Sequence, residues 1–224
     1  PDHIVHDFNA FADYIRQGPI SVAWLTSALC NLLIDTRPDF FEFLSQLMVG
    51  GEALSAKHIN QLRARYPELK VRNNYGPTEN TIFSTSFLIQ QDYENNIPIG
   101  SAITQKRAYI LNDKLEVVAP ETNGVLYVAG EGLARGYLNM PQETREKFIS
   151  DPFNKGQRMY FTGDLCRYNA VGEIEYLGRV DDQVKILGHR IELGEIEAVV
   201  KSLKQVNQVV VLHKALGTKI KGLA

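Results

Sequence analysis

The sequence predicts an α/β protein: a parallel-sheet α/β layer, a small β-barrel-like subdomain, and the start of a small α+β subdomain. Helical and strand-type spacings of apolar residues alternate up to about residue 97. From 98 to 180, short β-type runs are separated by glycine, proline and asparagine turns, which is typical of a small barrel. Mixed helix and strand patterns then return. We therefore expect three parts, residues 1–97, 98–180 and 181–224, the last of them incomplete.

Helices and strands alternate in the first part. Asp7 is a suitable N-cap for a helix that turns Phe8 and Ile15 inward. A buried strand over 20–24 should follow, with Trp24 in the core. The further elements expected here are a helix over 28–34, a strand over 46–49, a helix capped by Ser55, and a strand over 70–74. This order predicts a parallel sheet.

The second and third parts contain shorter elements. Four runs of β-type residues predict strands at 108–111, 125–129, 158–161 and 173–176, with a short helix near Pro141. In the last part we expect a strand over 184–187, a helix over 193–203 and a strand over 206–213.

Composition excludes several classes of protein. The 224 residues include 24 basic and 26 acidic ones, a net charge of −2, so neither nucleic acid nor an anionic membrane is expected as a partner. Cys30 and Cys166 stand far apart without a CxxC, which argues against a disulfide scaffold or a cysteine zinc site. The sequence has no signal peptide and no membrane-spanning run, so we expect a cytoplasmic protein.

The segment Asn73-Asn-Tyr-Gly-Pro-Thr-Glu-Asn80 follows a predicted strand and turns at Gly76-Pro77. Loops at strand ends are where open α/β sheets bind ligands. This loop could present the Tyr75 ring, the Thr78 hydroxyl and the Glu79 carboxylate to one ligand. An ordinary Gly-Pro turn with polar tips explains the same residues equally well.

Three other segments each allow two interpretations. Gly130 to Gly136 has GxGxxxG spacing and no helix directly after it, so it fits turn glycines rather than a dinucleotide-binding loop. Asp164, in Tyr160-Phe-Thr-Gly-Asp-Leu165, suits the two hydroxyls of a ribose but also a plain turn. The charged stretch 178–197 fits a conformational hinge, or a solvated hairpin before a helix that begins with acidic residues.

Four segments occur in a characteristic order: NNYGPTEN, GVLYVAGEGLARGYLN, YFTGDL and GRVDDQVKILGHRIELGEIE. Together they resemble the adenylation domains of non-ribosomal peptide synthetases, and the resemblance covers essentially the whole chain. It implies that an amino acid and ATP give aminoacyl-AMP and pyrophosphate, and that the acyl group then passes to a phosphopantetheine thiol. The implied partners are a peptidyl carrier domain and neighbouring synthetase domains. A fatty- or aryl-acid CoA ligase, or a non-catalytic remnant that docks partner proteins, are the alternatives.

The resemblance also assigns residues to ATP and Mg²⁺. Tyr75 would stack on adenine, while Asp164 and Arg179 would hold the ribose. Thr78 would contact phosphate and Glu79 would hold Mg²⁺; with Lys185 these two form the expected catalytic set. The full nucleotide set implied by the resemblance is Asn73, Asn74, Tyr75, Gly76, Thr78, Asp164, Tyr176 and Arg179.

The remaining implied positions concern the substrate and the carrier. Asp181 matches the family hinge, and Lys185, Gly188 and Arg190 match the face presented during thioester formation. The amino-acid pocket would be formed by Ala28, Met48, Gly50, Asn74, Ile82 and Phe83. All six are uncharged, so a neutral, largely apolar amino acid is expected, leucine-like before aromatic. The family's phosphate loop, its substrate-ammonium aspartate and its C-terminal lysine match nothing in this chain, which alone should be inactive.

Overall fold

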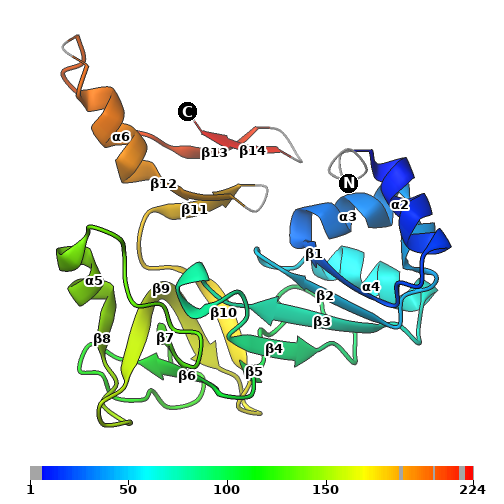
Figure 1. Cartoon of the computed structure of the whole chain (residues 1–224), viewed down its shortest axis with the longest axis horizontal. Coiled ribbons are helices and arrows are strands. Elements are labelled where there is room, and N and C mark those ends of the chain that lie inside the picture. The colour runs from blue at the N-terminus through cyan, green and yellow to red at the C-terminus, as the bar shows by residue number, and fades with distance from the viewer. Residues whose placement is uncertain (1–6, 187–188, 204, 217–219, 224) are drawn as a thin grey trace. The chain divides into compact units, whose positions relative to one another are not determined.

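The structure, a computed structural model, describes residues 7–186, 189–203, 205–216 and 220–223 (Figure 1). It divides into two compact units, Pro1–Gly178 and Arg179–Ala224. No helix in the described part of the chain is long and apolar enough to cross a membrane.

The first unit begins with a five-stranded sheet in the order β1-β2-β3-β4-β5. Its strands are β1 (Val22–Thr26), β2 (Gln46–Gly50), β3 (Lys70–Tyr75), β4 (Thr85–Leu88) and β5 (Ser101–Ala102). The pairs β1–β2 and β2–β3 are parallel, which confirms the predicted layer, whereas β3–β4 and β4–β5 are antiparallel. The helical elements are α2 (Phe8–Gln17), α3 (Ser27–Thr36), η1 (Pro38–Phe41) and α4 (Ala56–Arg65).

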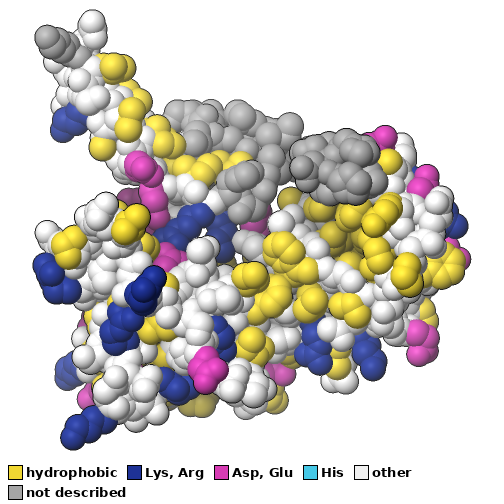
Figure 2. Space-filling view, viewed as in Figure 1, with side chains coloured by type: hydrophobic (Ala, Val, Ile, Leu, Met, Phe, Trp, Pro, Cys, Tyr) yellow, Lys and Arg dark blue, Asp and Glu magenta, His cyan; other side chains and the backbone are white. Residues whose placement is uncertain are grey.

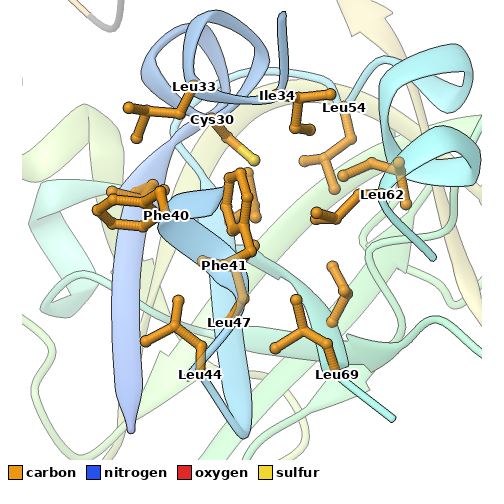
Figure 3. Close-up of a cluster of buried hydrophobic side chains, with 14 of the residues drawn as sticks. Cys30, Leu33, Ile34, Phe40, Phe41, Leu44, Leu47, Leu54, Leu62 and Leu69 are labelled. Carbon is orange, nitrogen blue, oxygen red and sulfur yellow. The ribbon is translucent and has the colours of Figure 1, made fainter. Parts of the chain in front are cut away.

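The core of this layer lies between the helices and the sheet (Figure 3). Phe40, Phe41 and Leu47 are fully buried there and meet Leu33 from α3. The ring centroids of Phe40 and Phe41 are 5.0 Å apart in an edge-on arrangement. The Asp7 carboxylate caps α2 as predicted, accepting from the backbone N–H groups of residues 9 and 10 at 2.9 and 3.2 Å.

Two predictions about burial in this layer are wrong. The strand predicted over 20–24 forms at Val22–Thr26 but lies at the edge of the sheet, where Leu25 alone is buried and Trp24 is 47% exposed. Phe8 is also exposed: α2 turns Ala12 and Ile15 inward, so the prediction is correct for Ile15 and wrong for Phe8. Periodicity finds a helix or strand but does not show which strand ends up at an edge.

The second sheet of this unit is antiparallel, in the order β10-β9-β7-β6, with β8 paired to β9. Its strands are β6 (Lys106–Leu111), β7 (Gly124–Gly130), β8 (Phe148–Ser150), β9 (Arg158–Tyr168) and β10 (Ile174–Arg179), and α5 (Pro141–Lys147) precedes β8. The barrel-like expectation is confirmed. Strand β9 runs through Gly163 and Asp164, so the plain turn suggested for Asp164 is wrong; the pairing with β7 shifts register there.

The second unit contains two hairpins and one helix. These are β11 (Gln183–Ile186) with β12 (His189–Glu192), α6 (Leu193–Lys201), and β13 (His213–Leu216) with β14 (Ile220–Leu223). A hairpin therefore forms within the charged stretch, and the hinge interpretation of the same stretch stays a prediction. The strand predicted over 206–213 is wrong, because residues 206–212 have no regular structure and β13 begins only at His213. Val210 and Leu212 are 70% and 60% exposed, and β-type residues without a neighbouring strand do not make a ladder.

Candidate nucleotide and amino-acid site

The connection from β3 to β4 is a tight loop over residues 76–84 (Figure 1). The Ser84 N–H donates to the Tyr75 carbonyl at 2.7 Å, which closes the loop at its base. A Cβ on Gly76 would lie 2.3 Å from the Ile82 carbonyl oxygen, so only glycine fits there. Thr81 and Ile82 hold φ angles of +54° and +57°, a costly conformation for β-branched residues. Such strain often marks a functional loop.

The segment Gly130–Tyr137 fastens this loop from the other side. Thr81 Oγ1 donates to the Gly132 carbonyl at 2.7 Å, and the Ala134 N–H donates to the Glu79 carbonyl at 2.8 Å. Lys106, on β6, donates from Nζ to the Asn80 carbonyl at 2.5 Å. The turn glycines expected in 130–136 are therefore part of a support for the 76–84 loop.

Glu79 is 6% exposed, and its Oε1 accepts a hydrogen bond of 2.6 Å from the Tyr137 hydroxyl. The Tyr137 and Tyr160 hydroxyl oxygens are 3.2 Å apart. Burial raises the pKa of Tyr137 far above its usual value, and the bond to Glu79 adds to the shift. Tyr137 therefore keeps its proton at neutral pH. The sequence analysis missed this residue, whose partner lies 58 positions away.

Tyr75 and Asp164 meet across the first unit although 89 positions separate them. The Tyr75 hydroxyl donates to Asp164 Oδ2, and the Asp164 N–H donates to Thr162 Oγ1 at 3.0 Å. Burial, followed by the charge of Asp164, raises the pKa of Tyr75 well above its usual value. The residues expected at adenine and at ribose thus lie side by side, because β3 and β9 bring them together.

A cavity of about 430 Å³ opens beside the loop. It is lined by Trp24, Gly51, Asn74, Gly76, Thr78, Thr81, Ile82 and Phe83. Trp24, Gly51 and Thr81 are the lining residues that the sequence analysis missed. Trp24 meets Phe83 edge-on, with ring centroids 6.1 Å apart. Since β1, β2 and β3 are parallel, their carboxyl ends meet at one edge of the sheet, and this rule could have pointed to Trp24 and Gly51.

Three expected pocket residues do not line this cavity: Ala28, Met48 and Gly50. Ala28 lies in the first turn of α3, and Met48 is half-buried within β2. A Cβ on Gly50 would lie 2.2 Å from the Asn74 carbonyl oxygen, so glycine is required there for β2 to pair with β3. Asn73 is buried, and its amide donates to the carbonyls of residues 97 and 98 at 3.1 and 2.9 Å.

The other predicted residues lie on β10 and in the second unit. Tyr176 is part of β10, and its carbonyl accepts from the Asn96 amide at 3.0 Å. Arg179 donates to both carboxylate oxygens of Asp181, at 2.6 and 2.7 Å. Lys185 and Arg190 occupy paired positions in the β11–β12 hairpin. Gly188 lies outside the described residues.

The donors available for Mg²⁺ are oxygen atoms. Among the described residues, no group of three or more His, Cys, Asp or Glu side chains is placed to hold a metal by itself. Mg²⁺ usually binds to one or two carboxylates together with the phosphates of a nucleotide. A buried carboxylate at Glu79, beside the exposed Thr78 hydroxyl, fits an ion that arrives with ATP.

Comparison with known proteins agrees with this geometry. A model of the AMP-binding enzyme family matches residues 1–138. The chain belongs to this family. It is 48% identical, over 96% of its length, to tyrocidine synthase 3 of Brevibacillus parabrevis, and 46% identical, over 93%, to gramicidin S synthase 2 of Brevibacillus brevis. The chain spans only 3% and 5% of these two relatives.

Solved structures show which kind of AMP-binding enzyme this chain is similar to. PA1221, described as a non-ribosomal peptide synthetase protein containing adenylation and PCP domains, superposes with a TM-score of 0.87 at 34% identity. The match covers 96% of this chain and 44% of that one. The resemblance found in the motifs is therefore confirmed: the chain is part of an adenylation domain.

Proposed function

We propose that this chain contributes the nucleotide- and substrate-binding residues of a domain that activates an amino acid as its adenylate and loads it on a carrier-domain thiol. The observation that carries the proposal is the cavity beside the 76–84 loop. Predicted nucleotide residues, Gly76 and Thr78, line it together with predicted pocket residues, Ile82 and Phe83. Two substrates that must react with each other need a shared space of this kind.

In the proposed reaction, an oxygen of the amino-acid carboxylate attacks the α-phosphorus of ATP. The bond between that phosphorus and the bridging oxygen breaks, and pyrophosphate leaves with the electron pair. Tyr75 and Asp164 orient the adenosine, and Thr78 contacts phosphate. Glu79 would hold Mg²⁺, which supplies charge neutralisation on the phosphates when bound. For Arg179, the proposed role in ribose binding rests on the family resemblance alone.

The cavity favours a neutral, largely apolar amino acid. None of its eight lining residues carries a charge, so an ionised side chain would lose its hydration without gaining a partner. Trp24, Ile82 and Phe83 add apolar surface to the cavity, and Asn74 and Thr81 add uncharged polar side chains. We keep a leucine-like aliphatic substrate ahead of an aromatic one.

Transfer to the phosphopantetheine thiol is assigned to the second unit. Asp181 is the proposed hinge, and Lys185, Gly188 and Arg190 the proposed face toward the carrier. The division into residues 1–97, 98–180 and 181–224 is part of the same proposal. Lys185 and Arg190 share one hairpin, which gives that face two cations next to each other in register.

The test is pyrophosphate exchange by a complete adenylation domain that contains this sequence, assayed across the amino acids with Mg²⁺ and ATP. We expect exchange that depends on a neutral apolar amino acid, and thioester formation when the cognate holo-carrier domain is added. A preference for Asp, Glu, Lys or Arg would contradict the substrate assignment. Exchange that depends only on fatty or aryl acids would favour the CoA-ligase alternative, and no exchange with any acid would favour a non-catalytic role.

A further inference from the structure

Tyr137 makes the contact of 2.6 Å to the Glu79 carboxylate from outside the 76–84 loop. It reaches Glu79 from the end of the Gly130–Tyr137 segment, whose Ala134 also bonds the Glu79 backbone. Both the main chain and the side chain of Glu79 are thus held by the same short segment. Glu79 is 6% exposed, so a swing of its carboxylate into water would break this packing.

Tyr137 is itself held on three sides. Its N–H donates to Thr144 Oγ1 on α5 at 2.9 Å, and its ring meets Phe148 edge-on at 5.5 Å. On the third side, the Tyr160 hydroxyl oxygen lies 3.2 Å from the Tyr137 hydroxyl oxygen. A Cβ on Gly136 would lie 2.3 Å from the Thr144 side chain, so the segment packs tightly against α5. The phenol is therefore a rigid donor.

We infer that Tyr137 is a positioning residue that fixes the orientation of the Glu79 carboxylate for Mg²⁺; the inference rests on the proposed role of Glu79 as the Mg²⁺ ligand. Mg²⁺ demands near-octahedral geometry, so a carboxylate that must be ordered on binding holds it less tightly than one already fixed. Hydrogen bonds to metal-ligating carboxylates typically matter by about 10- to 100-fold in metal affinity or activity. The glycines of the Gly130–Tyr137 segment allow its backbone to place the Tyr137 hydroxyl next to the 76–84 loop.

The test is Tyr137→Phe in the complete adenylation domain, which keeps the ring and removes only the donor. We expect the Mg²⁺ concentration for half-maximal pyrophosphate exchange to rise about tenfold. We expect a similar rise in the dissociation constant of Mn²⁺, measured by electron paramagnetic resonance with a non-hydrolysable ATP analogue. If Tyr137→Phe does not fold, Thr144→Val removes the support behind Tyr137 and should shift both constants in the same direction by a smaller factor.

The matched control is Tyr109→Phe, since Tyr109 is another phenol of the first unit that donates to a buried carboxylate, that of Asp151, but neither residue lines the cavity. This control should lower thermal stability without moving either metal constant. Adding Tyr137→Phe to Glu79→Gln should cause no further change in Mn²⁺ binding, because the ligand is already lost. Wild-type metal constants in Tyr137→Phe would overturn the inference. An inactive wild-type domain would instead count against the proposed function.

Discussion

Glu79 is the residue on which the proposed chemistry depends most directly. Its carboxylate is nearly buried, and its main-chain carbonyl and one side-chain oxygen both accept hydrogen bonds from the Gly130–Tyr137 segment. A buried carboxylate that serves packing alone is rare, because its hydration must be replaced by partners or by a cation. These contacts fit a Glu79 carboxylate whose position is fixed before a metal–nucleotide complex binds.

Glu79→Gln should reduce pyrophosphate exchange by about 100- to 1,000-fold, the scale seen when one electrostatic contact to a transition state is removed. ATP binding, measured by calorimetry, should weaken much less. The amide is the same size and still accepts from Tyr137, so the loop should fold. Glu131→Gln, an exposed acid in the adjoining segment, is the control and should behave as wild type. An unchanged exchange rate in Glu79→Gln would remove Glu79 from the mechanism.

At the scale of single residues, sequence reasoning groups candidate residues correctly in space where they are contiguous in the chain, and their roles stay predictions. Gly76, Thr78 and the apolar pair after Thr81 stand in one short stretch, and the structure gathers them at one cavity. Trp24 and Tyr137 were missed because their partners lie about sixty positions away, and pairing of that kind depends on the strand order. Trp24 looked like core, since nothing in its neighbours marks β1 as an edge strand.

At the scale of elements, the 76–84 loop shows how a glycine serves a site without a positive φ. Gly76→Ala would press a methyl group against the Ile82 carbonyl and the Ser84 nitrogen, 2.3 and 2.7 Å away. We expect a loss of about 1–3 kcal/mol in the free energy of unfolding and a loss of exchange, as for overpacked sites. Urea denaturation measures the first. Gly194→Ala is the control: its Cβ meets open space in α6, so stability should hold or rise slightly. Equal stability of the two variants would refute the steric argument.

The elements that sequence patterns predicted well are those that satisfy their own hydrogen bonds or alternate regularly. Helices α2, α3 and α4 and strands β2 and β3 lie within a few residues of their expected ranges. Strand β9 was predicted too short because Gly163 and Asp164 have turn-type composition, yet pairing with β7 continues on both sides of them, at Phe161 and at Leu165. The prediction for residues 206–212 was wrong in the opposite direction, because a strand was expected where none forms. Their β-type side chains have no neighbouring strand among the described residues.

At the scale of the whole molecule, the first unit leaves part of its apolar surface open. Hydrophobic side chains gather on the face that carries β1 and α3 (Figure 2). Val22 and Trp24 on β1 are 49% and 47% exposed, and Leu32 on α3 is 37% exposed. The chain spans 44% of the PA1221 chain. Stability and activity should therefore be measured on a complete adenylation domain that contains this sequence.

Alkaline pH should destabilise the fold through its buried tyrosines. Burial raises the pKa of Tyr75 and Tyr137 well above 10, and smaller upward shifts affect Tyr93, Tyr109, Tyr127 and Tyr168. Above about pH 10 the unfolded chain releases these phenol protons while the folded chain keeps them, so stability falls as pH rises. The melting temperature should therefore drop across this range, with the tyrosinate absorbance of these six tyrosines appearing only on unfolding. In Tyr137→Phe the drop should be shallower. A melting temperature independent of pH would contradict these shifts.

The boundary between the two units falls at Gly178–Arg179, and Asp181 stands three residues beyond Gly178 in the bend between β10 and β11. If the second unit must turn between the two half-reactions, the backbone here has to change its dihedral angles. Asp181→Pro fixes φ near −65° and restricts the residue before it, so adenylate formation should proceed while loading of the carrier thiol fails. Asp181→Asn is the control, because it weakens the ion pair with Arg179 but leaves the backbone free. It should load the carrier at close to the wild-type rate. Single-turnover thioester formation after preformed adenylate measures both variants, and normal loading by Asp181→Pro would show that no rotation about this residue is needed.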